Sequence, residues 1–413
     1  MGAPRSSAAP VEAPVEAQGS ETEEERLADA LLRSAVGGSS APRRRARFHS
    51  LEVAEVRPLT DDAIEVVFAV PGELAGEFDY LPGQHVALRH EIEGREVRRS
   101  YSLCRMPDSA TGEGPGTVSV AIKRDRGGLF STWAHEHLRP GVRIDVMSPQ
   151  GTFTTRLADL DGAHVAAVAA GSGITPLMAL ATAVLGRSET ARFTLLCTNR
   201  SARDVMFLEE LADLKDRYPA RFALLHVLTR EQRSVPLLSG RLDEEKLRAI
   251  FERLIVPATI DEWFLCGPME LVQLCRDVLA DSGVAPARIR YELFTADREE
   301  GVPSNVGAPR GPVATREEEQ VIEIAFTLDG QSTTVRSPAS AKESVLSAAL
   351  RVRADTPFAC AGGVCGTCRA LLVSGSVSMA ENYALEPAEI ERGFVLTCQS
   401  HPSSDRVVVD YDV

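Results

Sequence analysis

Four cysteines in the last part of the chain constrain its fold and chemistry more than any other feature. Cys360, Cys365 and Cys368 follow the spacing C-x4-C-x2-C, and Cys398 follows after a stretch long enough for a strand. Four thiolates at this spacing can hold two iron ions. We therefore predict a [2Fe-2S] cluster that is bound by these four side chains.

Small residues separate the first three cysteines. Gly362, Gly363 and Gly366 would let backbone N–H groups approach the sulfides and offset the negative charge of the cluster. A structural zinc site is the alternative, but zinc ribbons usually present paired C-x2-C knuckles. Because residues 360–368 contain only one such pair beside a longer gap, the spacing favours iron and sulfide.

The composition limits the size and class of the protein. With 413 residues, 44% of them hydrophobic, the chain can form two or three domains, each with its own core. A formal net charge of −14 disfavours nucleic-acid binding and suits docking on basic partners. No apolar run approaches the roughly 20 residues that span a bilayer, and no apolar signal segment follows the first basic residues. We expect a cytoplasmic protein with no nucleic-acid or membrane partner.

The chain has eight cysteines, which in such a protein indicate metal or redox chemistry rather than a disulfide framework. Cys104, Cys197 and Cys275 lie in apolar or strand-like stretches. We expect these three to be small core residues without a chemical role.

Changes in composition divide the chain into five segments. Residues 1–47, rich in Ala, Pro, Glu, Ser and Arg without a strand pattern, are predicted to be a disordered leader. Residues 48–157 alternate short strands with Gly/Pro turns and predict an antiparallel β-barrel. Residues 158–296 show the β-α-β rhythm of an α/β domain with a parallel sheet. A linker is predicted at 297–319 and the cluster domain at 320–413.

The leader and the linker carry weaker signals. A capping box, Thr22-Glu23-Glu24-Glu25, predicts a marginal solvated helix, with docking on a partner as the alternative. The basic run at 43–47 is expected to be solvated. A flexible segment as long as the linker spans on the order of 25 Å, enough for the last domain to swing between two docking sites.

The predicted barrel contains two motifs suited to a flavin. Arg99, Ser100, Tyr101 and Ser102 end a strand hairpin that turns at Glu93-Gly94, and they offer a guanidinium for pyrophosphate, an aromatic face and a hydroxyl. Each motif alone would better suit a basic strand edge or an ordinary turn. Their order and spacing favour the flavin site.

The second motif follows the strand 117–122. Glycine amides at a helix start would bind phosphate. The candidate cofactor-binding residues here are Lys123, Gly127, Gly128 and Ser131.

A glycine turn in the α/β domain is typical of nucleotide binding. Gly171, Gly173, Thr175 and Pro176 directly follow the apolar strand His164–Ala170 and open a helix predicted at 177–185. The glycines allow a pyrophosphate to approach the N-terminus of this helix, and Pro176 suits the first turn of the helix. A strand at 191–197 and a helix at 205–217 are predicted next.

A later strand supplies a further candidate. Cys266, Gly267, Pro268 and Met269 lie at the C-terminal end of the predicted strand 263–266, where ligands of open parallel sheets bind. Cys266 could also be a core residue. Its place before Gly-Pro favours an active-site position.

The residues after the strand 191–197 predict the choice of nucleotide. Arg200 and Arg203 could meet a 2′-phosphate, and no acidic residue precedes Asp204 to bind a ribose 2′-hydroxyl. We expect NADPH to be preferred over NADH. The alternative is that both arginines face solvent without effect.

Together these motifs resemble the ferredoxin–NADP reductase superfamily, and the cluster segment resembles plant-type ferredoxins. From 48 to 413, the order of the segments is similar to that in the family of reductase subunits of bacterial phenylacetyl-CoA epoxidases. The most specific stretches are 205–211, 214–218, 382–387 and 393–398. Steroid hydroxylase reductases share the architecture. The resemblance implies an α+β β-grasp fold for the cluster domain and favours FAD over FMN.

The resemblance also implies roles for residues. Arg99 would pair with the FAD pyrophosphate, Tyr101 would stack on the flavin, and Ser102 would lie near its reactive nitrogen. Cys266 would lie beside the nicotinamide, so that Ser102 and Cys266 are the candidate catalytic residues. Phe294 resembles the aromatic residue that covers the flavin.

At Ala361 this sequence departs from many ferredoxins, which have a basic residue after the first cysteine.

These parts predict an electron-transfer reductase. NADPH donates hydride and a [2Fe-2S] cluster accepts one electron, so a flavin must stand between them. The expected acceptor is the di-iron oxygenase that epoxidises phenylacetyl-CoA, and a Rieske-type hydroxylase is the alternative. A non-catalytic electron carrier and a self-sufficient flavin reductase or oxidase are further alternatives, against which the intact flavin motif and the attached cluster argue.

Overall fold

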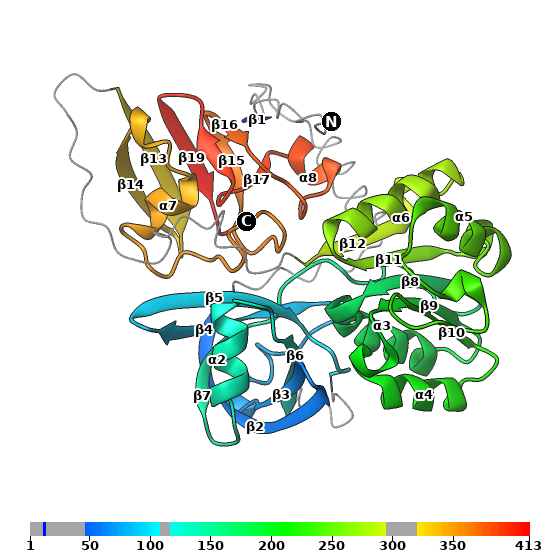
Figure 1. Ribbon diagram of the computed structural model, residues 1–413. Coiled ribbons are helices and arrows are strands. Elements are labelled where there is room, and N and C mark those ends of the chain that lie inside the picture. Colours follow the sequence, from blue (N-terminus) through cyan, green and yellow to red (C-terminus); the bar gives the residue numbers. More distant parts are fainter. Residues whose placement is uncertain (1–10, 14–45, 108–115, 295–319) are drawn as a thin grey trace. The chain divides into compact units, whose positions relative to one another are not determined.

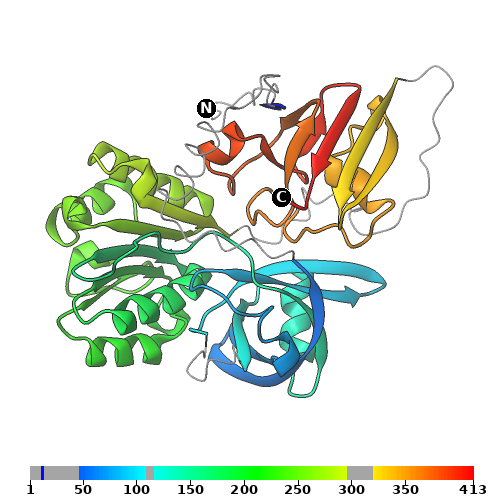
Figure 2. The ribbon, with the colours of Figure 1, turned by 180° about the vertical axis from the view of Figure 1, so that it is seen from behind.

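The computed structural model describes residues 11–13, 46–107, 116–294 and 320–413 (Figures 1 and 2). The chain divides into two compact units. The larger unit is Ala46–Ser304, and the smaller unit combines Asn305–Val413 with Met1–Arg45. The expected helix after Thr22, the basic run and the linker lie outside the described residues.

The first part of the larger unit is a six-stranded antiparallel sheet with the order β5-β4-β7-β2-β3-β6. An isolated bridge between Leu103 and Val120 joins its two ends and closes it into a barrel. The strands are β2 (Phe48–Thr60), β3 (Ala63–Ala69), β4 (His85–Ile92), β5 (Arg95–Ser102), β6 (Thr117–Lys123) and β7 (Arg143–Met147).

The hairpin turn and the helix of the barrel follow from local sequence. Glu93 and Gly94 both have positive φ, at 53° and 73°, which is the backbone of a two-residue turn between β4 and β5. The helix α2 (Leu129–His137) begins after Gly128 and packs Phe130 and Ala134 into the apolar barrel core.

The second part of the larger unit is a parallel sheet with the order β10-β9-β8-β11-β12. Its strands are β8 (His164–Ala170), β9 (Arg192–Asn199), β10 (Phe222–Leu228), β11 (Glu262–Gly267) and β12 (Ile289–Leu293). The intervening helices are α3 (Ile174–Arg187), α4 (Leu208–Arg217), α5 (Glu244–Arg253) and α6 (Met269–Asp281). The strand order reverses between β8 and β11, so right-handed crossovers place α3 and α4 on one face and α5 and α6 on the other.

Two helices of this sheet differ from their predicted limits. The helix expected to open at Leu177 begins at Ile174, because a 3-10 turn at Gly171–Gly173 leads directly into it. The helix expected from Val205 begins at Leu208. Phe207 has a left-handed backbone with φ 59°, so the helix cannot start before it.

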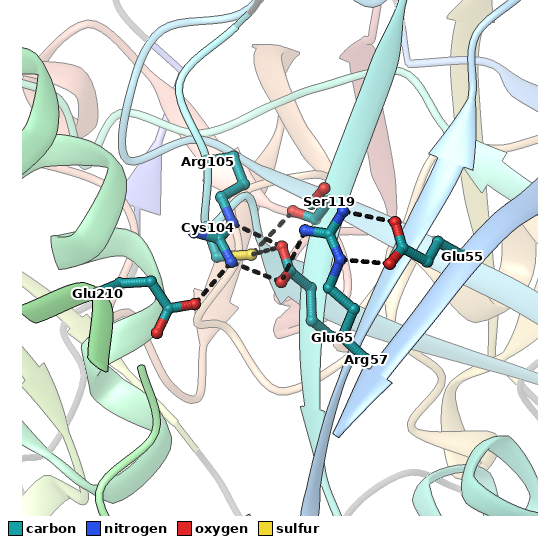
Figure 3. A network of polar contacts seen from close by, with 7 residues as sticks. All are labelled: Glu55, Arg57, Glu65, Cys104, Arg105, Ser119 and Glu210. Atoms are coloured by element: carbon teal, nitrogen blue, oxygen red, sulfur yellow. Dashed lines mark hydrogen bonds and ion pairs between the residues drawn. The ribbon is translucent and has the colours of Figure 1, made fainter. Parts of the chain in front are cut away.

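A polar network joins the barrel to α4 (Figure 3). The side chain of Glu65 on β3 is fully buried, and it accepts two hydrogen bonds of 2.6 Å from Arg105. Arg105 also donates to Glu210 of α4 at 3.0 Å and lies 5.3 Å from the centre of the Phe207 ring. The Cys104 thiol lies 3.8 Å from Glu65. Arg105 thus links a buried carboxylate of the barrel to the first turn of α4.

The smaller unit contains a mixed five-stranded sheet with the order β14-β13-β19-β15-β17. Its strands are β13 (Val321–Leu328), β14 (Gln331–Pro338), β15 (Arg369–Ser374), β17 (Phe394–Leu396) and β19 (Arg406–Asp410). The helix α7 (Val345–Leu350) packs against β13 and β14, and α8 (Pro387–Glu391) packs against β17. This is the expected α+β arrangement.

A second sheet in the smaller unit has the order β1-β16-β18. Its strands are β1 (Val11–Glu12), β16 (Ser376–Met379) and β18 (Ser400–Pro402). The prediction that the leader contains no strand is therefore wrong for Val11–Glu12. This short pairing depends on contacts with residues more than 360 positions away, so no local pattern could indicate it.

Within the described parts of the chain, no helix is both long enough and apolar enough to cross a membrane. Cys104, Cys197 and Cys275 are buried, as expected, but the Cys104 thiol lies in the polar network around Glu65 rather than in apolar surroundings.

Candidate functional site

The four predicted cluster ligands come from two loops of the smaller unit. Cys360, Cys365 and Cys368 precede β15, and Cys398 lies between β17 and β18. Thr397 holds the loops together, because its N–H and hydroxyl both donate to the Cys368 carbonyl, at 3.1 and 2.8 Å.

The thiols lie close enough to affect one another. Hydrogen bonding with Cys365, together with burial, raises the pKa of Cys360 well above its ordinary value. Hydrogen bonding with Cys368, followed by burial, does the same for Cys398. Two hydrogen-bonded pairs of thiols on adjoining loops are a donor set whose chemistry fits an iron–sulfur cluster.

The loop backbone is shaped for a close approach to the thiols. The Gly362 N–H donates to the Cys360 sulfur at 3.4 Å. Gly363 has φ 76°, and a Cβ there would lie 2.9 Å from the Glu381 carbonyl oxygen. Ala361, where the sequence departs from many ferredoxins, adopts φ 51°, and its carbonyl accepts a 2.7 Å bond from Gln399.

The flavin motif brings β5 next to α2. Arg99 and Tyr101 alternate along β5 with Ser100 and Ser102, so the two pairs face opposite sides of the strand. The ring of Tyr101 lies 5.8 Å from that of Phe130 in the first turn of α2. The Ser100 hydroxyl oxygen is buried without a hydrogen-bond partner, which fits a site that a polar ligand completes.

The residues of the turn before α2 differ in backbone conformation and hydrogen bonding. Gly127 has φ 80° with open space at its Cβ position, and Gly128 is an N-cap without a side-chain cap bond. The Gly128 N–H donates to the Asp125 carbonyl at 3.1 Å, so this amide is used within the turn. The Ser131 hydroxyl is also used within the turn, because it accepts from the Asp125 N–H at 3.1 Å.

The nucleotide turn lies at the switch point of the parallel sheet. Cys266 of β11 pairs with Ala169 of β8, so the loops after both strands meet at one edge. A Cβ on Gly173 would lie 2.2 Å from the Cys266 carbonyl oxygen, so only glycine fits there. Thr175 and Pro176 are buried in the first turn of α3, where they shape the turn. The Thr175 hydroxyl donates to the Ser172 carbonyl at 3.0 Å.

The loop after β11 also needs its glycine. Gly267 has φ 152°, and a Cβ there would lie 3.0 Å from the Ala170 side chain. The Gly267 carbonyl accepts from the Phe294 N–H at 3.1 Å, which brings Phe294 to the switch point. Pro268 caps α6, and Met269 is exposed at its first position.

Sequence reasoning missed the residue that connects these parts. Glu292 of β12 accepts a hydrogen bond of 3.2 Å from Ser102, and it lies 4.0 Å from His85 of β4. Burial and then the charge of Glu292 raise the pKa of Cys266 well above its ordinary value. One carboxylate therefore bonds one predicted catalytic residue, Ser102, and acts electrostatically on the other, Cys266. Its position two residues before Phe294 was the only available signal.

Arg200 and Arg203 line a pocket of about 360 Å³ after β9. Its other lining residues are Asp61, Asp62, Ser201, Asp204 and Arg230. Arg200 is held by acids on both sides, with Asp62 at 2.9 Å and Asp204 at 2.5 Å.

Asp62 of the barrel also forms an ion pair with Lys123 at 3.4 Å. Lys123, which the sequence predicts to bind the flavin, therefore pairs with a residue that lines the pocket after β9. Burial alone would raise the pKa of Asp62, but Thr60, Lys123 and Arg200 outweigh it and lower that pKa.

Family models cover both units. The oxidoreductase FAD-binding domain matches residues 50–155, and the oxidoreductase NAD-binding domain matches residues 167–277. The 2Fe-2S iron-sulfur cluster binding domain matches residues 326–403. With the fold and the clustered thiols, these matches define an NAD(P)H-dependent flavoprotein oxidoreductase with a [2Fe-2S] cluster.

Relatives match along nearly their whole length. The E component of 1,2-phenylacetyl-CoA epoxidase from Escherichia coli (strain K12) is 40% identical over 88% of this chain and 98% of its own. The ferredoxin reductase component of 3-ketosteroid-9-alpha-monooxygenase from Mycobacterium tuberculosis (strain CDC 1551 / Oshkosh) is 35% identical over 88% and 95%. This chain belongs to the family of FAD-, NAD- and [2Fe-2S]-binding reductases, within the ferredoxin–NADP reductase superfamily, that includes both proteins.

A solved structure agrees in fold. Phthalate dioxygenase reductase, described as a modular structure for electron transfer from pyridine nucleotides to [2Fe-2S], has a TM-score of 0.52 at 22% identity. The match covers 88% of this chain and 98% of that one. The three family models confirm the FAD, the nicotinamide cofactor and the cluster as the classes of cofactor expected from the sequence.

Proposed function

We propose that this reductase passes electrons from NADPH to a multicomponent oxygenase, and that the oxygenase is a di-iron enzyme acting on phenylacetyl-CoA. The observation that carries the proposal is the 40% identity to the E component of 1,2-phenylacetyl-CoA epoxidase, over 98% of that protein's length. The bound FAD supplies the conversion of a two-electron hydride donor into one-electron transfers to the cluster. This chain's own residues bind and orient the cofactors.

The proposed flavin site uses both faces of β5. Arg99 binds the pyrophosphate and Tyr101 stacks on the ring, while Gly127 and Gly128 shape the turn that leads phosphate to the start of α2. Support comes from the contact of Tyr101 with the first turn of α2. Ser102 faces the nicotinamide side, where its hydroxyl donates to Glu292.

The proposed nicotinamide site is the switch point of the parallel sheet. Gly171 and Gly173 admit the pyrophosphate to the start of α3, and Cys266 and Phe294 lie beside the ring. Glu292 accepts a hydrogen bond from the Ser102 hydroxyl, and burial together with the Glu292 charge keeps the Cys266 thiol neutral near neutral pH.

NADPH is the proposed donor because arginines line the pocket after β9. Arg203 and Arg230 are exposed there and could bind a 2′-phosphate. Arg200 already has two acidic partners, so it orders the pocket wall and Arg203 provides the selectivity.

Reconstitution tests the acceptor. The purified holoprotein, mixed with the oxygenase components of a phenylacetyl-CoA epoxidase, should support NADPH-dependent epoxidation of phenylacetyl-CoA. The second candidate is a Rieske-type steroid hydroxylase, favoured by the 35% identity to the ketosteroid monooxygenase reductase. Support of that hydroxylase, without support of the epoxidase, would replace the first proposal by the second.

A further inference from the structure

A piece of the leader binds the smaller unit outside every matched domain. Val11 pairs with Val377 in antiparallel register, and the Ala13 N–H donates to the Gly375 carbonyl at 3.1 Å. Val11 and Ala13 are half-buried against the apolar core of the smaller unit, whereas Glu12 is exposed. This alternation is that of an edge strand with one buried face. The matched domain models begin only at residue 50.

The leader sequence suits this pairing. In antiparallel pairs every second residue points its N–H toward the partner strand, and here residues 13 and 11 do so. The prolines at 10 and 14 fall on the other set of positions, where no donor is needed. Since the residue before a proline is restricted to extended conformations, Pro14 also biases Ala13 toward the strand before binding.

The leader contains this binding sequence twice. Residues 10–13 and 14–17 both read Pro-Val-Glu-Ala. A slip by four residues is even, so it keeps valine and alanine on the buried face. The second copy can therefore replace the first, and a test must change both.

The acceptor strand is close to the cluster. β16 ends at Met379, which packs in one apolar group with Cys368 and Cys398. Four residues further on, the Tyr383 N–H donates to the Gly363 carbonyl of the cluster loop at 3.0 Å. A change in the conformational stability of β16 should therefore affect the loop that holds the proposed cluster ligands.

We propose that Val11–Ala13 is an intramolecular strand ligand of β16 and gives the smaller unit a second connection to the larger one. One connection runs through residues 295–319 and the other through residues 14–45. Fully extended, they reach at most about 85 Å and about 110 Å. Because both connections are long, they limit the distance between the two units little. Attachment at two points should instead restrict rotation of the smaller unit. The bound leader also covers a sheet edge that other chains could otherwise pair with.

Amide hydrogen exchange of the full-length holoprotein tests the proposal. The variant Ala13→Pro/Ala17→Pro removes the donor to Gly375 from both repeats. The control, Glu12→Pro/Glu16→Pro, adds as many prolines at positions whose N–H points away from β16. Exchange in the peptide covering 374–380 should accelerate about five- to tenfold in the first variant, as expected for losing one net hydrogen bond, and stay unchanged in the control.

A chain lacking residues 2–17 should show the full acceleration. A synthetic peptide of residues 9–17, added at millimolar concentration, should then restore protection, because tethered segments have effective concentrations in that range. Equal exchange in all four proteins, or no restoration by the peptide, would overturn the proposal. Cofactor content and electron transfer are not part of either readout, so the result is independent of the acceptor.

Discussion

Glu292 lies where β4, β5 and β11 approach β12. Its carboxylate contacts Ser102 and His85 and acts on the pKa of Cys266. The group therefore connects the proposed flavin side of the site to the nicotinamide side. A carboxylate in this position can order a hydroxyl and keep a thiol protonated without meeting substrate itself.

Replacing Glu292 by glutamine should slow flavin reduction by NADPH about 10- to 100-fold while leaving FAD content unchanged. The amide can still accept from Ser102 but has no charge. Stopped-flow absorbance of the flavin measures the rate, with Glu270→Gln, at the exposed start of α6, as the control.

The Cys266 thiol should not titrate in the physiological range. Because burial and Glu292 raise the Cys266 pKa, this thiol stays protonated below about pH 8. Cys266→Ala should therefore lower the rate of flavin reduction without changing the shape of its pH profile below that pH. A new titration in that range would contradict this role.

The cluster ligands can be tested against a matched cysteine. Cys368→Ala should lose the iron, the sulfide and the paramagnetic signal of the reduced cluster, and should retain FAD. Cys275→Ala removes a buried thiol from α6 and should keep all three. Metal analysis and electron paramagnetic resonance measure the outcome. Full cluster content in Cys368→Ala would exclude Cys368 as a ligand.

Nucleotide choice should depend on Arg203 more than on any other single arginine. Arg203→Ala should lower kcat/KM for NADPH about tenfold, the value of one charged hydrogen bond, and leave NADH unaffected. Arg217→Ala, exposed at the end of α4, is the control. Steady-state kinetics with both donors decide the matter. A wild-type preference for NADH would refute the assignment of the pocket.

The contact between strand β3 and helix α4 depends on Arg105 (Figure 3). It gives the fully buried Glu65 two short hydrogen bonds, and the other nearby cation, Arg57, lies 3.7 Å away. Glu210 at the other end is about one-third exposed, at 34%. The two ends of this contact should therefore differ in energy.

Arg105→Ala should destabilise the larger unit by about 3 kcal/mol, because it leaves a buried carboxylate poorly paired. Glu210→Ala should cost less than about 1 kcal/mol, since both side chains of its bond to Arg105 are about one-third exposed. Calorimetry of the holoprotein measures both. Equal losses would mean that the contact with α4, rather than the burial of Glu65, dominates.

The elements show what local sequence can and cannot predict. The turn at Glu93-Gly94, the glycine turn before α3 and the cysteine loop were predicted because each depends on residues close in sequence. The pairing of Asp62 with Arg200 joins residues 138 positions apart, and Ser102 and Glu292 are 190 apart. Only the closed barrel and the assembled sheet bring such residues together. The start of α4 was missed because a left-handed Phe207 has no sequence signal.

The net charge of the cluster domain should govern docking of the acceptor. From Gln320 onward the chain has 11 acidic and 7 basic side chains, a balance of 7 − 11 = −4. We expect the apparent Kd for the oxygenase to rise severalfold between about 50 and 300 mM salt, since screening weakens contacts between exposed charges. Titration of the oxygenase at several salt concentrations measures this. A Kd independent of salt would point to an apolar docking surface.

The order of strands in the smaller unit has a consequence for biosynthesis. β19 is the last strand of the domain in sequence, yet it lies in the middle of the sheet, parallel to β13 and antiparallel to β15. Asp412 then binds the N–H groups of Asp329 and Gly330 at the first hairpin. The sheet beneath the cluster loop therefore cannot close until these residues have left the ribosome. The larger unit, which is synthesised earlier, can fold before it. Iron and sulfide should accordingly enter after translation of the domain, into a chain whose flavin site is already formed.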